Sequence, residues 1–127
     1  MSIQVLKTVS DAMEAMGVEY AFGTYAKNPI VYPYFVGEYT ETEPTTEDGL
    51  QETTFLLTGF SRDTWLTLEN ARERIESYFN KVSGKTVITD NGSAVAVFYA
   101  GCLIVPTGDA ELKRIQINLH IKEWKVN

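Results

Sequence analysis

The strongest constraint on the fold is a strict alternation of apolar and polar residues near the C-terminus, in the stretch RIQINLHIK at 114–122. Successive side chains of a strand point to opposite faces, so the apolar positions share one face and the polar positions share the other. The apolar set is Ile115, Ile117, Leu119 and Ile121, and the polar set is Arg114, Gln116, Asn118, His120 and Lys122. We therefore predict an antiparallel sheet with a core on one side only.

Further strands are predicted at 18–25 (VEYAFGTY), 30–39 (IVYPYFVGEY) and 52–60 (ETTFLLTGF), which are rich in β-branched and aromatic residues. Pro33 has no N–H to donate, so strand 30–39 is expected at a sheet edge or with a bulge there. Two apolar runs within 85–105 flank Asn91-Gly92, a dipeptide typical of a type I′ hairpin turn.

Two segments have the apolar spacing of helices. The first covers 2–16, begins at Ser2 and is followed by Gly17, where a left-handed cap is expected. Its predicted buried face is Leu6, Val9, Met13 and Met16. The second begins after Asp63 or Thr64, and its predicted stripe is Trp65, Leu68, Arg72, Ile75 and Phe79, widened by Ala71, Tyr78 and Val82.

The order of these elements is helix, strands, helix, strands. Separated helices and antiparallel hairpins predict an α+β fold, a mostly antiparallel β-sheet with two main helices packed on one face. The length of 127 residues suits a single domain spanning 1–127.

Charge and cysteine content narrow the function classes. The net charge of −6 gives no attraction to phosphate backbones, so direct nucleic-acid binding is not expected. The single cysteine fits folding in a reducing cytosol. No apolar run approaches the roughly 18 residues that a membrane span requires. The N-terminus lacks the basic segment and continuous apolar run of a signal peptide, so none is expected.

The sequence offers little catalytic chemistry. It holds one cysteine and one histidine, too few for a usual zinc site, and no glycine-rich phosphate loop. Cys102 lies in an apolar run and is expected to be a buried small hydrophobe, while His120 is expected on the polar strand face. Adjacent strands could still bring the two together as a nucleophile and base. We expect no enzyme, no cofactor and no metal.

An acidic loop is predicted at about 38–52, between the second and third strands. Its carboxylates Glu41, Glu43, Glu47 and Asp48 lack the rhythm of a calcium-binding loop. We expect this loop to be mobile in an isolated subunit and to become ordered against a partner in an assembly.

Aromatic residues are concentrated ahead of this loop: Tyr20, Phe22, Tyr25, Tyr32, Tyr34, Phe35 and Tyr39. Alternation places them on both faces of the sheet, and one small core does not need them all. They are either half-buried residues of a sheet rim or part of a protein interface, where tyrosine is enriched. The residues alone leave both interpretations open.

The order of motifs carries a family resemblance. An N-terminal amphipathic helix precedes the strand motif PYFVG at 33–37, a later strand ends in FSR at 60–62, and a helix then begins near Trp65. With the alternating C-terminal strand, this arrangement resembles the tail-completion (tail-terminator) proteins of long-tailed bacteriophages and the related head–tail joining proteins. Pro33, Tyr34 and Gly37 match the strand motif, and Ser61 and Arg62 match the strand-to-helix junction.

This resemblance implies a structural role without catalysis. Such proteins form a ring, usually of six subunits, on the end of the tail tube, where they stop its growth and present a surface to the head. The implied partners are copies of the chain itself, the major tail tube protein and the head–tail connector, in the tail or neck of a virion assembled in the host cytoplasm. The expected interface is Tyr32, Tyr34, Phe35 and Tyr39 with Glu41, Glu43, Glu47, Asp48 and Arg62.

Two other functions remain open. The first is a small prophage-encoded or bacterial protein-binding module that uses an aromatic sheet face. The second is an enzyme, which would need a pocket with convergent polar groups.

Overall fold

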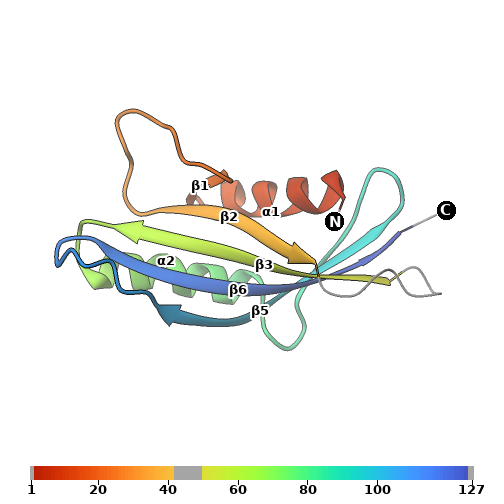
Figure 1. Ribbon diagram of the computed structural model, residues 1–127. Helices are drawn as coiled ribbons and strands as arrows, with labels where there is room; N and C mark the ends of the chain where they lie inside the picture. Colours follow the sequence, from red (N-terminus) through yellow and green to blue (C-terminus); the bar gives the residue numbers. More distant parts are fainter. Residues whose placement is uncertain (1, 42–49, 126–127) are drawn as a thin grey trace.

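A computed structural model describes residues 2–41 and 50–125. The helices are α1 (Ile3–Ala15) and α2 (Trp65–Tyr78), and the strands are β1 (Glu19–Phe22), β2 (Tyr34–Glu41), β3 (Leu50–Ser61), β4 (Lys85–Ile88), β5 (Ala94–Ile104) and β6 (Lys113–Trp124). These strands form one sheet in the order β1-β2-β3-β6-β5-β4, and among their five pairings only β1–β2 is parallel. Both helices lie on the same face of this sheet (Figure 1). The predicted α+β class is confirmed.

Strands β3 and β6 form the centre of the sheet and show why one face is covered. Buried and half-buried residues alternate along both strands, and their registers place buried residues opposite one another, as in the pair Leu57–Ile117. The predicted inward set of β6 is buried, whereas Gln116 and Asn118 are half-buried rather than exposed. One hydrophobic core therefore fills the layer between this face and the helices. No helix of the described residues lies on the opposite face, and we call it the open face.

Helix α1 buries a face rotated slightly from the predicted one. Its buried residues are Val5, Val9, Ala12 and Met13, and Leu6 and Met16 are only half-buried. Ser2 occupies the N-cap position, but its side chain donates a hydrogen bond to the buried carboxylate of Glu123 instead of capping the helix. Gly17 adopts the expected left-handed conformation, with φ of 71°.

Helix α2 begins as predicted and ends earlier. The hydroxyl of Thr64 accepts a hydrogen bond from the Thr67 backbone N–H, the usual N-cap arrangement. The helix ends at Tyr78, so Val82 does not extend its buried stripe and is 81% exposed. Arg72 lies at the flank, where its guanidinium binds Glu69 and Glu76 and donates to the hydroxyl of Tyr99.

Two predictions about β2 were wrong. The strand begins at Tyr34, directly after Pro33, so the proline removes no hydrogen bond from the ladder and no bulge is needed. From Tyr34 to Gly37, directly after the proline, β2 also lies between β1 and β3 rather than at an edge. The predicted loop at about 38–52 is shorter than expected, because β2 continues to Glu41 and β3 begins at Leu50. The expected mobility of the rest of that loop falls on residues outside those described.

The hairpin between β4 and β5 exists, but its turn is not type I′. Among the described residues only glycines have positive φ, so Asn91 does not adopt the conformation that a type I′ turn requires. Gly92 has φ of 85°, its N–H donates to the carbonyl of Thr89, and the Thr89 N–H donates to the carbonyl of Ser93. These bonds define a three-residue loop that ends in a left-handed glycine.

Candidate assembly interface

A row of aromatic side chains crosses one end of the open face. Tyr34 of β2 lies directly opposite Phe60 of β3, and Phe60 lies opposite Arg114 of β6. The rings of Tyr34 and Phe60 stack with centroids 5.1 Å apart, and the Arg114 guanidinium lies 6.0 Å from the centroid of Phe60. Tyr25 stacks on the other side of Tyr34 at 4.2 Å. We call Tyr25, Tyr34, Phe60 and Arg114 the aromatic row.

The loop before β2 is held against this row by polar contacts. The hydroxyl of Tyr25 donates to the carboxylate of Glu19 at 3.1 Å and accepts from the backbone N–H of Val31 at 3.2 Å. Lys27 forms an ion pair with the same Glu19 at 3.3 Å. The loop therefore places Tyr32 beside the row, with its ring centroid 5.6 Å from that of Tyr34.

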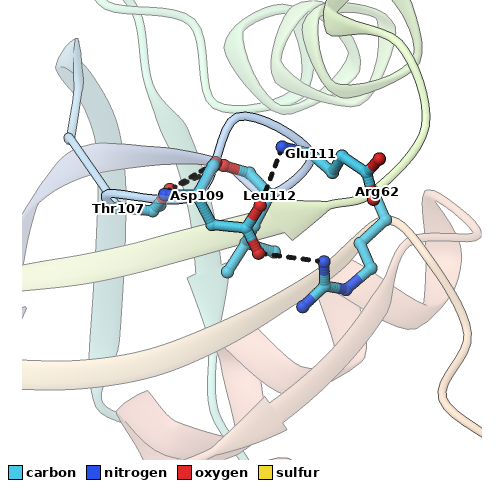
Figure 2. Close-up of polar contacts among 5 residues, drawn as sticks. All are labelled: Arg62, Thr107, Asp109, Glu111 and Leu112. Carbon is cyan, nitrogen blue, oxygen red and sulfur yellow. Dashed lines mark hydrogen bonds and ion pairs between the residues drawn. The ribbon is translucent and has the colours of Figure 1, made fainter.

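Arg62 connects this end of the sheet to the loop between β5 and β6 (Figure 2). Its guanidinium Nη1 lies 3.2 Å from Oδ2 of Asp109, and the other oxygen of that carboxylate accepts from the backbone N–H of Glu111 at 2.9 Å. Thr107 closes the loop by donating its hydroxyl to the carbonyl of Leu112 at 2.8 Å. Ser61, the other residue of the junction motif, accepts from the N–H of Asp63 and so fixes the turn into α2.

These contacts shift the pKa values of the charged groups in the expected directions. Hydrogen bonding to Tyr32, and then to Asp109, raises the pKa of Arg62. The Glu111 N–H, followed by Arg62, lowers the pKa of Asp109. Burial, and next to it the neighbours Tyr32 and Tyr25, raises the pKa of Tyr34. Tyr34 is therefore neutral at pH 7, with the Arg62–Asp109 ion pair beside it and the positively charged Arg114 at the other end of the row.

The predicted interface residues do not form one surface. Tyr32, Tyr34 and Arg62 gather at the end of the sheet that carries the aromatic row. Phe35 is fully buried, so its inclusion as an interface residue was wrong: alternation along β2 turns it into the core beneath the helices. Tyr39 shares the helix-covered face, is 42% exposed and packs on Phe22 with centroids 6.2 Å apart.

The acidic residues of the predicted interface fall mostly outside the described part of the chain. Glu41 is the last residue of β2 and is exposed. Glu43, Glu47 and Asp48 belong to 42–49, which the structure does not describe. Their predicted role as a contact arm stays a prediction.

A second exposed apolar surface was missed by the sequence analysis. Ile104 of β5 is 66% exposed, Leu103 49%, and Trp65 at the start of α2 46%. Cys102 lies beside them and is exposed, so the prediction of a buried cysteine was wrong. These four residues line one hollow together with Glu69 and Arg72. We call Trp65, Cys102, Leu103 and Ile104 the β5 patch. Its signal in the sequence was the apolar run GCLIV, which also fits a buried strand.

Cys102 and His120, the two residues considered as a nucleophile and base, do not come together in the structure. His120 lies on the open face, as expected, with Nε2 3.6 Å from a carboxylate oxygen of Glu52. Cys102 lies on the other face, so the two do not form a nucleophile–base pair. Within residues 2–41 and 50–125, no three histidine, cysteine or acidic side chains cluster as metal ligands would. The same part of the chain contains no helix long and apolar enough to cross a membrane.

Comparisons with known proteins support the fold. No family model matches the sequence. No curated protein matches it either. A solved structure does match: a chain of the virion of the native gene transfer agent particle, with a TM-score of 0.67. The match covers 94% of this chain and 89% of that chain at 10% sequence identity. At this identity the comparison establishes a shared α+β fold over almost the whole chain.

Proposed function

We propose that this protein is a structural component of a phage or phage-like virion. More specifically, we propose that it forms a ring, of six subunits, at the end of the tail tube, terminates tail assembly and joins the tail to the head. Its partners are then copies of itself, the major tail tube protein and the head–tail connector. On this proposal it acts without catalysis or a cofactor, and it is assembled in the host cytoplasm.

The observation that carries this proposal is the fold shared with a chain of a gene transfer agent virion over 94% of the sequence. The tail-terminator assignment rests in addition on the motifs PYFVG and FSR. The structure gives physical reasons for both motifs. Gly37 leaves room for the side chains of Tyr20 and Phe55, and Arg62 joins the end of β3 to the loop at Asp109.

Electron microscopy of the purified protein tests ring formation directly. The net charge of −6 makes subunits repel one another, and salt screens this repulsion beyond a Debye length of about 10 Å at 0.1 M. We therefore expect closed rings that become more abundant as protein and salt concentrations rise. A protein that remains monomeric under all these conditions, even with purified tail tubes, would contradict the proposal.

A deletion in the phage that encodes the gene tests the place in assembly. Without a terminator we expect overlong tails, or tails that are not attached to filled heads. Restoring the gene from a plasmid should restore normal virions, which controls for effects on neighbouring genes. Normal virions from the deletion strain would rule out the tail-terminator function.

The aromatic row favours one alternative function. Its stacked rings lie on the open face, so a small binding module could use them to hold a single protein partner. On this alternative, the protein forms no rings, and substituting Tyr34 by serine abolishes its binding to that partner. Genes for tail and connector proteins next to this one would favour the virion role instead.

A further inference from the structure

The outer strand on each side of the sheet is short, and each leaves part of a longer strand uncovered. β1 pairs with β2 only from Tyr34 to Gly37. β4 pairs with β5 only from Ala94 to Val97, and a bulge follows between Tyr99 and Gly101. Among the described residues, β2 therefore has only β3 as a strand neighbour from Glu38 to Thr40, and the later part of β5 has only β6.

These two free stretches lie on opposite margins of the sheet and run in opposite directions. Each step from β2 to β3, from β3 to β6 and from β6 to β5 is antiparallel, so β2 and β5 are antiparallel to each other. Figure 1 shows β2 and β5 on the two sides of the central pair β3 and β6, with their arrowheads at opposite ends. If a second copy is placed beside the first in the same orientation, its β2 meets β5 of the first as an antiparallel neighbour.

Apolar side chains flank both free stretches on the same face. Tyr39 lies opposite the core residue Phe55, which places it on the helix-covered face beside the 45% exposed Phe22. Cys102 and Ile104 lie opposite the core residues Ile117 and Ile115, so these two residues of the β5 patch are on that face as well, whereas Leu103 lies opposite Gln116 on the open face. Joining the two edges would cover Tyr39 and Phe22 with Cys102 and Ile104.

We propose that the free edge of β2 in one subunit pairs antiparallel with the free edge of β5 in the next, giving one continuous sheet through the ring. This contact rests on the proposed ring and identifies the surfaces that build it. The contact is heterologous, because it joins two different edges, and only such a contact repeats from subunit to subunit until a ring closes. Helices of all subunits then lie on the same side of the continuous sheet. An exposed strand edge readily pairs with a strand of another chain. A second copy of this protein supplies such a strand in the required antiparallel direction.

Cysteine crosslinking tests this contact, because the chain already has one cysteine at the β5 edge. In Tyr39→Cys, the new thiol lies on the same face as Cys102 of the neighbouring subunit. Strand neighbours on one face have Cβ atoms about 4.5–5.5 Å apart, within reach of a short bismaleimide. Because each subunit then carries one thiol at each edge, we expect a ladder of covalent oligomers up to the full ring on a denaturing gel.

Matched controls lie on the same strand. Glu38 and Thr40 are opposite Leu56 and Thr54 on the open face, so Glu38→Cys and Thr40→Cys should give much weaker ladders than Tyr39→Cys. The unsubstituted protein has only Cys102 and should give at most dimers. Circular dichroism of each variant confirms that the fold is kept.

Four results would overturn the proposal. Equal ladders from Tyr39→Cys and Thr40→Cys would show that the two edges do not pair in this way. Strong dimers of the unsubstituted protein without a ladder from Tyr39→Cys would indicate a symmetric contact. Rings visible by electron microscopy without crosslinks would refute this contact but leave the proposed function intact, whereas the absence of any assembly would refute both.

Discussion

Replacing Gly59 with alanine should destabilise the protein, because an aromatic ring occupies the space of the missing side chain. Gly59 of β3 lies directly opposite Phe35 of β2. A Cβ at position 59 would lie 2.4 Å from Cε2, 2.8 Å from Cζ and 2.9 Å from Cδ2 of that ring. Phe35 is fully buried, so the ring has no route into solvent.

The size of the effect follows from two opposing contributions. Overpacking a well-filled core costs typically about 1–3 kcal/mol, and three close contacts with an enclosed ring place Gly59→Ala in the upper part of that range. Alanine also restricts the unfolded chain, which stabilises the folded state by about 0.4–1 kcal/mol. We therefore expect a net loss of about 1–2 kcal/mol in the free energy of unfolding.

Urea unfolding followed by tryptophan fluorescence measures this loss. Thr58→Ala is the matched control, because Thr58 is the adjacent residue of β3 on the open face and should change stability by less than about 0.5 kcal/mol. Phe35→Leu should reduce the cost of Gly59→Ala in a double-mutant cycle, since it removes the clashing ring. A Gly59→Ala protein that is as stable as the original, or a cost that Phe35→Leu leaves unchanged, would refute this reasoning.

Three further predictions use the same unfolding assay. Ile117→Ala should lose about 2–5 kcal/mol, because Ile117 is fully buried, while Gln116→Ala should change little; similar losses for both would contradict the assigned strand faces. Thr64→Ala should lose about 1 kcal/mol with the N-cap of α2, and no loss would show that the cap does not contribute. Burial raises the pKa of Tyr20 from 10.0 to about 12, so the folded state favours the neutral phenol. The contribution of Tyr20 to the free energy of unfolding is therefore complete below pH 10 and is lost as pH rises from 10 to 12. Tyr20→Phe should abolish that alkaline loss. It should also keep or raise stability at pH 7, because the buried hydroxyl that it removes has no hydrogen-bond partner. A marked loss of stability at pH 7 would contradict this.

The elements were predictable where a repeating pattern forces one answer. The alternation in β6 fixed its buried face, and the Thr64 cap and the apolar spacing located the start of α2. The errors arose where one residue permits two structures. Pro33 would remove a ladder hydrogen bond only if it lay inside a strand, and here it directly precedes Tyr34, the first residue of β2. Asn91-Gly92 fits more than one hairpin loop.

The candidate interface was less predictable than the fold, because sequence gives the residues of a face but not which edges remain uncovered. Tyr34 and Phe35 are adjacent in sequence and lie on opposite faces, one in the aromatic row and the other in the core. The exposure of Cys102 depends on β4 being too short to cover the end of β5. Strand lengths and registers decide such features, and local composition does not report them.

The position of β6 has a consequence for how this protein folds. β6 follows all the other strands in sequence but lies at the centre of the sheet, where it joins β1-β2-β3 to β5-β4. Neither half of the sheet is connected to the other by strand pairing until residues 113–124 are in place. During synthesis, the inner edges of β3 and β5 therefore stay without their partner strand until residues 113–124 have emerged from the ribosome. Pairing over such long sequence separations is slow, so a chaperone that shields β3 and β5 in this interval should raise the yield of folded protein.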